Sequence, residues 1–169
     1  SEISGAARQA ITSLIEASGL KAKVTITTDV SEATRKRAAP ASIRFENGEA
    51  IIELNMAEIR DMGANKQDVV TTLVAHELGH AWMQEKGLRI PQEVLASLYD
   101  AYKKARAASP AGHVYRKKKG VGFDEWFADQ FMTYALRKSK ATATPTQKYF
   151  AKVWKGISSV INALGKALF

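Results

Sequence analysis

Residues 69–84 read VVTTLVAHELGHAWMQ, and their pattern predicts the helix around which the rest of the chain is organised. Glu77 is the one formally charged side chain in this stretch, which lies between Asp68 and Glu85. Burying an unpaired carboxylate in an apolar interior is so costly that such a group pairs, loses its charge or faces a cation. The stretch therefore predicts a buried helix in which the carboxylate of Glu77 pairs, loses its charge or faces a cation.

The sequence HELGH at 76–80 supplies that reason. His76 and His80 are spaced i, i+4, which puts both imidazoles on one face of a helix, where they can hold a single metal ion. Glu77 lies about 100° round the helix from His76, so it points beside the metal and can reach a water there. Two imidazoles beside a carboxylate suit zinc better than magnesium or calcium. We predict a Zn²⁺ site, unless the match is a coincidence of ordinary core histidines.

Length, composition and charge limit the alternatives. The 169 residues predict one domain, 1–169, large enough for its own core. The absence of cysteine excludes disulfides, cysteine nucleophiles and cysteine-based zinc sites. The net charge of +8 favours acidic partners, although most surplus lysine of this kind is only a solvated surface.

The first twenty residues contain no basic segment followed by a long apolar run, so we expect neither a signal peptide nor a transmembrane segment. The chain also begins without Met, which is expected of an excised or processed part of a larger protein. A cytoplasmic location is compatible with this pattern, and the compartment stays unknown.

The remaining patterns predict an α+β fold, with a small antiparallel or mixed sheet packed on helices. Before the motif helix we expect a helix at 4–18, a strand at 21–29 and a hairpin at 42–55 that turns at Asn47-Gly48. Exposed connections are expected at 35–40 and 61–66. After the motif helix we expect helices at 92–107 and 123–137, a long loop at 109–122 and a C-terminal amphipathic helix at 147–169.

A catalytic zinc ion usually has three protein ligands, so a third ligand is needed. The sequence FDEWFADQF at 123–131 offers Asp124, Glu125 and Asp129 among aromatic residues. Glu125 and Asp129 share a helix face, so Glu125 can bind the metal while Asp129 accepts the ring N–H of a liganding histidine. Asp124 and His113 remain alternatives as the third ligand.

HELGH at 76–80 and EWFAD at 125–129 resemble the gluzincin metallopeptidases, which have HExxH followed by a distant Glu on a second helix. HELGHAW with EWFADQFMTYAL is most similar to lethal-factor-like peptidases and to compact zinc-peptidase domains of phage and mobile-element polyproteins. The resemblance covers about the central third of the chain. It implies a minimal zincin-like fold, endopeptidase activity on a protein or peptide substrate, and Glu77 as the general base. It also implies a place within a larger phage or bacterial protein.

The chain departs from this resemblance at the group that stabilises the oxyanion. Lethal-factor-like enzymes have a tyrosine shortly before the Glu ligand, and this chain has Lys118 at that offset. Tyr115 and His113 are the nearest candidates for a catalytic role, although loop residues of both types are often plain surface residues. A metzincin is excluded, because Met83 and Lys86 stand where that class has glycine and histidine.

The resemblance also implies how a substrate binds. Residues 49–55 would correspond to an edge strand that pairs with an extended peptide. Independently of the resemblance, Arg116 to Lys119 lie a few residues before Glu125, so we expect the loop 109–122 to border the cleft and to select acidic or extended peptides.

Two other interpretations start from the basic and apolar patterns. A nucleic-acid-associated metalloprotease acting on DNA-bound proteins would use the basic residues near 103–106, 116–119 and 137–140. A membrane or interaction module would use the helix at 147–169. We expect the chain to be a monomer.

Overall fold

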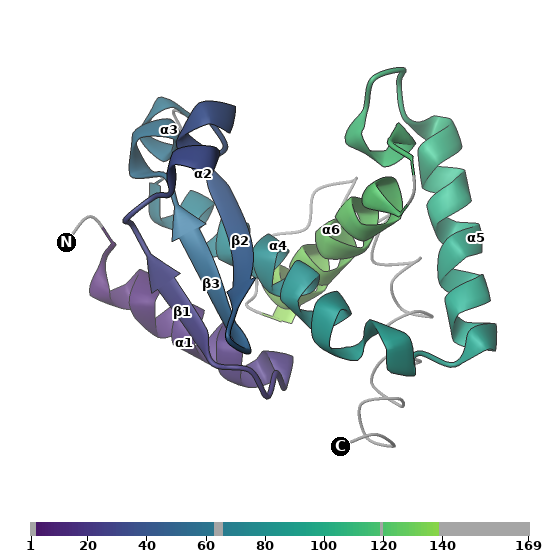
Figure 1. The fold of residues 1–169 in the computed structure, drawn as a ribbon, viewed down its shortest axis with the longest axis horizontal. Helices are drawn as coiled ribbons and strands as arrows, with labels where there is room; N and C mark the ends of the chain where they lie inside the picture. The colour runs from purple at the N-terminus through teal and green to yellow at the C-terminus, as the bar shows by residue number, and fades with distance from the viewer. Residues whose placement is uncertain (1–2, 63–65, 119, 139–169) are drawn as a thin grey trace. The chain divides into compact units, whose positions relative to one another are not determined.

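The computed structural model describes residues 3–62, 66–118 and 120–138 (Figure 1). These residues belong to two compact units, Ser1–Glu85 and Lys86–Phe169, which are described one at a time. Six α-helices and a three-stranded sheet in the described part confirm the α+β class. The single domain 1–169 stays a prediction, and the helix predicted at 147–169 lies outside the described residues.

The sheet of the first unit is mixed and has the order β1-β3-β2. The central strand β3 (Glu49–Leu54) pairs in parallel with β1 (Val24–Thr27) and antiparallel with β2 (Ala41–Glu46). The prediction that residues 49–55 form an edge strand is therefore wrong. Both sides of this strand are used in ladder hydrogen bonds, so its backbone cannot also pair with a substrate peptide.

The hairpin between β2 and β3 is confirmed, together with its turn. Asn47 has φ 51° and Gly48 has φ 75°. A two-residue hairpin turn that follows the twist of the strands needs positive φ at both positions, and Asn-Gly is the pair that adopts it most readily.

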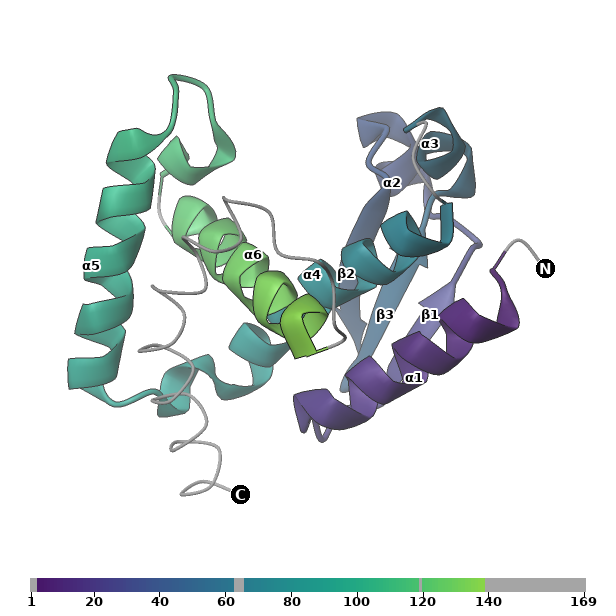
Figure 2. The ribbon, with the colours of Figure 1, turned by 180° about the vertical axis from the view of Figure 1, so that it is seen from behind.

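Two long helices cover one face of the sheet, as the opposite views in Figures 1 and 2 show. They are α1 (Gly5–Ser18) and α4 (Lys66–Lys86). Both ends of α1 are capped, since the Ser4 side chain accepts the Ala7 N–H and Gly19 has φ 67°. The core of the unit is apolar and comes from α1, α4 and the central strand β3, with Ala7, Ile11, Ala50, Ile52, Leu54, Val70, Val74 and Leu78 buried.

The helix α4 is attached near both of its ends to other parts of the first unit. The side chain of Gln67 accepts the Ser4 N–H at 2.9 Å, just before α1. The carboxylate of Glu85 accepts the N–H groups of Lys21 at 3.0 Å and Ala22 at 2.8 Å, just before β1. These bonds fix the helix that carries HELGH against its own unit.

Two short helices were not predicted. The stretch 35–40 was expected to be an exposed loop, but α2 (Glu32–Arg37) begins after the cap residue Ser31. Its last turn carries Arg35, Lys36 and Arg37, which suit the negative end of the helix dipole. The helix α3 (Met56–Asp61) lies between β3 and α4. The sequence patterns predict no helix or strand for residues 56–60.

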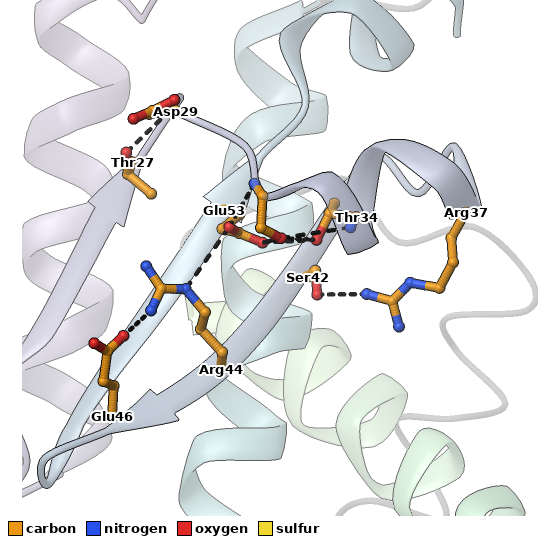
Figure 3. A network of polar contacts seen from close by, with 9 residues as sticks. Thr27, Asp29, Thr34, Arg37, Ser42, Arg44, Glu46 and Glu53 are labelled. Atoms are coloured by element: carbon orange, nitrogen blue, oxygen red, sulfur yellow. Dashed lines mark hydrogen bonds and ion pairs between the residues drawn. The ribbon is translucent and has the colours of Figure 1, made fainter.

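A buried carboxylate on β3 holds α2 to the sheet (Figure 3). Glu53 is 2% exposed and accepts hydrogen bonds from the Ser31 N–H at 2.8 Å, the Ser31 hydroxyl at 3.1 Å and the Thr34 hydroxyl at 2.6 Å. Burial by itself would raise the pKa of Glu53, but these hydrogen bonds and the nearby Arg44 guanidinium outweigh it. The pKa of Glu53 therefore lies below its usual value, and the residue is ionised and structural.

The second unit contains α5 (Gln92–Ala108) and α6 (Val121–Lys138). Aromatic rings pack between them, with the Tyr102 ring centroid 5.6 Å from that of Phe123 and 6.1 Å from that of Trp126. Short 3₁₀ turns lie at Gly87–Arg89 and Val114–Arg116, the second inside the loop predicted at 109–122. No described helix has both the length and the apolar character needed to cross a membrane.

Candidate metal centre

The two motif histidines lie side by side on α4, as the i, i+4 spacing predicts. Their ring centroids are 4.9 Å apart, in an edge-to-face arrangement. A nitrogen of His76 and a nitrogen of His80 lie within 4.8 Å of each other. Two nitrogens on one tetrahedral zinc ion are about 3.3 Å apart, since each Zn–N bond is about 2.0–2.1 Å long. The two imidazoles are therefore near enough that they could contact one common ion.

The packing of α4 explains why these rings remain accessible. Val70, Val74 and Leu78 follow one another at i, i+4 and i+8 and are completely buried. His76 and His80 lie on the other side of the helix axis and are only partly buried. One side of α4 therefore forms the core of the first unit, and the other side presents the imidazoles.

Glu77 is buried beside the histidines, with 7% of its surface exposed. The donors in this stretch are thus two imidazoles and a carboxylate, in a chain without cysteine. Nitrogen and oxygen donors of this kind suit zinc. The burial of Glu77 agrees with the prediction of a carboxylate inside this helix.

Glu125, the predicted third ligand, and Asp129, the predicted acceptor of a histidine ring N–H, lie on α6 in the second unit. Glu125 and Asp129 are both partly buried, whereas Asp124 is exposed. The aromatic residues Trp126 and Phe127 are buried next to them, each 1% exposed. As the spacing predicts, Glu125 and Asp129 lie one turn apart on the same face of α6.

Tyr115, a candidate for oxyanion stabilisation, is hydrogen bonded within the second unit. Its hydroxyl donates to Oδ2 of Asp129. Its carbonyl oxygen accepts the hydroxyl of Tyr102 at 2.5 Å. Burial raises the pKa of Tyr115 strongly, and so do the hydrogen bond and the negative charge of Asp129, with a further contribution from Glu125. Tyr115 is therefore a neutral phenol that acts as a donor.

His113, the other loop candidate, has a structural contact through one ring nitrogen. Its Nδ1 accepts the Tyr115 N–H at 3.1 Å, and its ring lies edge-on to the Tyr115 ring with centroids 4.3 Å apart. In a neutral imidazole one nitrogen accepts and the other donates. The Nε2–H of His113 is thus the group that could serve a substrate.

The basic run that follows Tyr115 divides into two kinds of residue. Arg116 donates from Nε to the Ser109 carbonyl at 2.8 Å and from Nη2 to the Ala107 carbonyl at 3.4 Å, so it closes the loop at the end of α5. Lys117 and Lys118 are exposed. Lys119 lies outside the described residues. Among the described lysines of the run Arg116 to Lys119, Lys117 and Lys118 carry exposed positive charge.

Two residues that the sequence does not mark as functional, Tyr102 and Gly122, lie against the backbone carbonyl of Tyr115. The sequence pattern assigns Tyr102 only to the apolar stripe of its helix, and Gly122 only to a loop. Their role depends on which residues meet across the unit, and no local pattern of residue types signals it.

No protein-family model, curated protein or solved structure matches this chain.

Proposed function

We propose that this chain is a zinc-dependent endopeptidase of the gluzincin type. The observation that carries the proposal is the pair of imidazoles on α4, His76 and His80, with the buried carboxylate of Glu77 next to them. A chance HExxH sequence does not require the two rings to be partly exposed on one face while the glutamate between them is buried. The resemblance of HELGH and EWFAD to gluzincins supports the same conclusion.

In this proposal His76 and His80 hold the metal through one ring nitrogen each. Glu125 is the third ligand, since it is a partly buried carboxylate on a second helix. A zinc ion bound there would act as the Lewis acid that activates water and polarises the scissile carbonyl. Asp129 would orient a liganding histidine by accepting its second ring N–H.

The proton transfers fall to Glu77. Its carboxylate accepts a proton from the attacking water and delivers it to the leaving amine, so no covalent intermediate with the protein forms. Since Glu77 is only 7% exposed, bulk water has little access to the carboxylate during these transfers. His113 is the donor we propose for the developing oxyanion, through Nε2–H. The hydroxyl of Tyr115 has one proton and donates it to Asp129, so we propose that Tyr115 acts through that contact.

The test combines metal analysis of the purified chain with digestion of a peptide library, with and without a chelator. We expect about one zinc ion per chain, cleavage that stops with chelator, and recovery when zinc is restored. Glu93→Gln, at an exposed position in the first turn of α5, is the matched control for the loss of activity in Glu77→Gln. Cleavage that survives complete removal of metal would refute the proposal.

A second candidate function is binding to nucleic acid, alone or combined with proteolysis at DNA. Lys103, Lys104 and Arg106 are exposed on α5, where they could contact phosphates. DNA retention that falls steeply with salt, and that is lost when these three residues become serine, would support it. Retention unchanged by the substitutions would exclude this surface.

A further inference from the structure

Hydrogen bonds donated by two tyrosine hydroxyls link Tyr102 to Tyr115 and Tyr115 to Asp129 in the second unit. The Tyr102 hydroxyl, on α5, donates to the carbonyl oxygen of Tyr115 at 2.5 Å. The Tyr115 hydroxyl donates to Oδ2 of Asp129, on α6. The chain thus runs from one helix through the 3₁₀ turn to the other, and its last member is the residue proposed to orient a zinc ligand.

The backbone of Tyr115 is held on both sides. Its N–H donates to Nδ1 of His113, and its carbonyl accepts from Tyr102. With the backbone held at both groups and the side chain partly buried, the phenol has little freedom to leave Asp129. The position of the Tyr115 hydroxyl is therefore set by contacts that lie outside its own side chain.

Gly122, in the first turn of α6, makes this arrangement sterically feasible. A Cβ atom at this position would lie 2.3 Å from the Tyr115 carbonyl oxygen and 2.5 Å from the Tyr102 hydroxyl oxygen. Contacts that short cannot be accommodated, and the closest one is to backbone, so the absence of a side chain lets the 3₁₀ turn approach α6. The close approach brings Tyr115 and the helix carrying Asp129 together.

We infer that Tyr102 is a positioning residue, which acts through Tyr115 to hold the carboxylate of Asp129 in one orientation. When a phenol holds Oδ2 of a carboxylate, the orientation of the whole carboxylate is fixed. A residue that accepts the ring N–H of a metal-binding histidine needs such a fixed orientation. The inference rests on the proposed function for its catalytic meaning. The contact chain on which it stands lies within the second unit and requires no metal.

The strongly raised pKa of Tyr115 supports this chain, because burial and Asp129 keep the phenol protonated. A protonated phenol can donate to the carboxylate throughout the neutral and mildly alkaline range.

The test compares Tyr102→Phe, Tyr115→Phe and Asp129→Asn with the control Tyr99→Phe. Tyr102→Phe removes one oxygen atom and retains the ring packed near Phe123 and Trp126. Tyr99 lies one turn earlier on α5 and also packs its ring on Phe123, at a centroid distance of 4.4 Å, so it matches the loss of one hydroxyl. Thermal unfolding of each variant checks that the fold is retained.

Three measurements separate positioning from general loss of structure. The first is the ¹³C resonance of the Asp129 side-chain carboxyl in metal-free protein, the second is zinc affinity by competition with a chromophoric chelator, and the third is kcat and KM. We expect Tyr102→Phe to move the carboxyl resonance in the direction of Tyr115→Phe. It should lower zinc affinity and kcat by roughly 3- to 10-fold with KM unchanged, less than the roughly 10- to 100-fold of a direct partner.

The double variant Tyr102→Phe/Tyr115→Phe should be no worse than Tyr115→Phe alone, because the first residue acts only through the second. An unmoved Asp129 resonance in Tyr102→Phe, or effects of the two substitutions that multiply, would overturn the inference. If wild-type protein neither binds zinc nor cleaves peptides, the proposed function fails, and the carboxyl resonance alone still decides whether Tyr102 positions Asp129.

Discussion

The buried carboxylate of Glu53 leads to a quantitative prediction for the unit that carries the motif helix. Glu53→Gln keeps the size of the side chain, but it removes the charge and replaces one acceptor oxygen with an NH₂ group. The wild-type carboxylate accepts three hydrogen bonds, two from Ser31 and one from Thr34, at 2.6–3.1 Å. At least one of these donors would then face a donor.

The magnitude follows from these contacts. A hydrogen bond to a charged group contributes about 1.5–3 kcal/mol, and a buried donor left without an acceptor costs about 1–3 kcal/mol. The Arg44 side chain is 46% exposed and lies 3.7 Å from the carboxylate, so solvent screening makes its contribution small. We expect Glu53→Gln to lower the free energy of unfolding by about 2 kcal/mol and Tm by about 4–8 °C.

The effect should depend on pH with a defined sign. Because folding lowers the pKa of Glu53 below its ordinary value of 4.5, the ionised carboxylate stabilises the folded state. This contribution is fully present above pH 4.5 and is lost as the pH falls through the folded-state pKa. The stability difference between wild type and Glu53→Gln should therefore shrink in acid.

Urea unfolding at several pH values, with thermal unfolding at neutral pH, measures both quantities. Glu32→Gln is the control, since it makes the same chemical change at a side chain that is 82% exposed and paired with Lys36 at 3.3 Å. We expect Glu32→Gln to change stability by less than about 0.5 kcal/mol. Equal losses in the two variants, or a Glu53→Gln loss that grows in acid, would refute the reasoning.

Three further predictions concern the proposed site. Glu77→Gln should keep its zinc, because it leaves both imidazoles in place, while kcat/KM falls by on the order of 10² or more; loss of zinc would instead make Glu77 a ligand. Glu125→Ala should nearly empty the zinc site, whereas Asp129→Asn should weaken zinc affinity or activity by roughly 10- to 100-fold. Metal titration and peptide kinetics measure both effects. A larger loss of zinc in Asp129→Asn than in Glu125→Ala would contradict the assignment. Replacing Lys117 and Lys118 by Ser should lower kcat/KM for acidic peptides at low ionic strength and much less at high salt, because exposed charges are screened beyond about 10 Å at 0.1 M. Equal losses for acidic and neutral peptides would show that these lysines do not select acidic substrates.

The features that could be predicted from sequence are those set within a few residues. Asn47-Gly48 determines the hairpin turn because these two residue types tolerate positive φ. Ser4 and Gly19 bound α1 because a hydroxyl can cap the first turn and a glycine can end the last. His76 and His80 share a face because the helix repeats every 3.6 residues. In each case the deciding interaction spans at most about one turn.

The features that only the tertiary structure decided join residues far apart in the chain. The central place of β3 depends on β1 pairing in parallel with it, after α2 and β2 have intervened. Glu53 is an ionised structural group because its donors, 19 and 22 residues earlier, lie at the start of α2, which meets the sheet at this carboxylate. The Tyr102–Tyr115–Asp129 chain likewise links residues 13 and 14 positions apart. Residue types state what each group can donate or accept, but which groups meet depends on strand order and helix packing, whose free energy is distributed over the whole core.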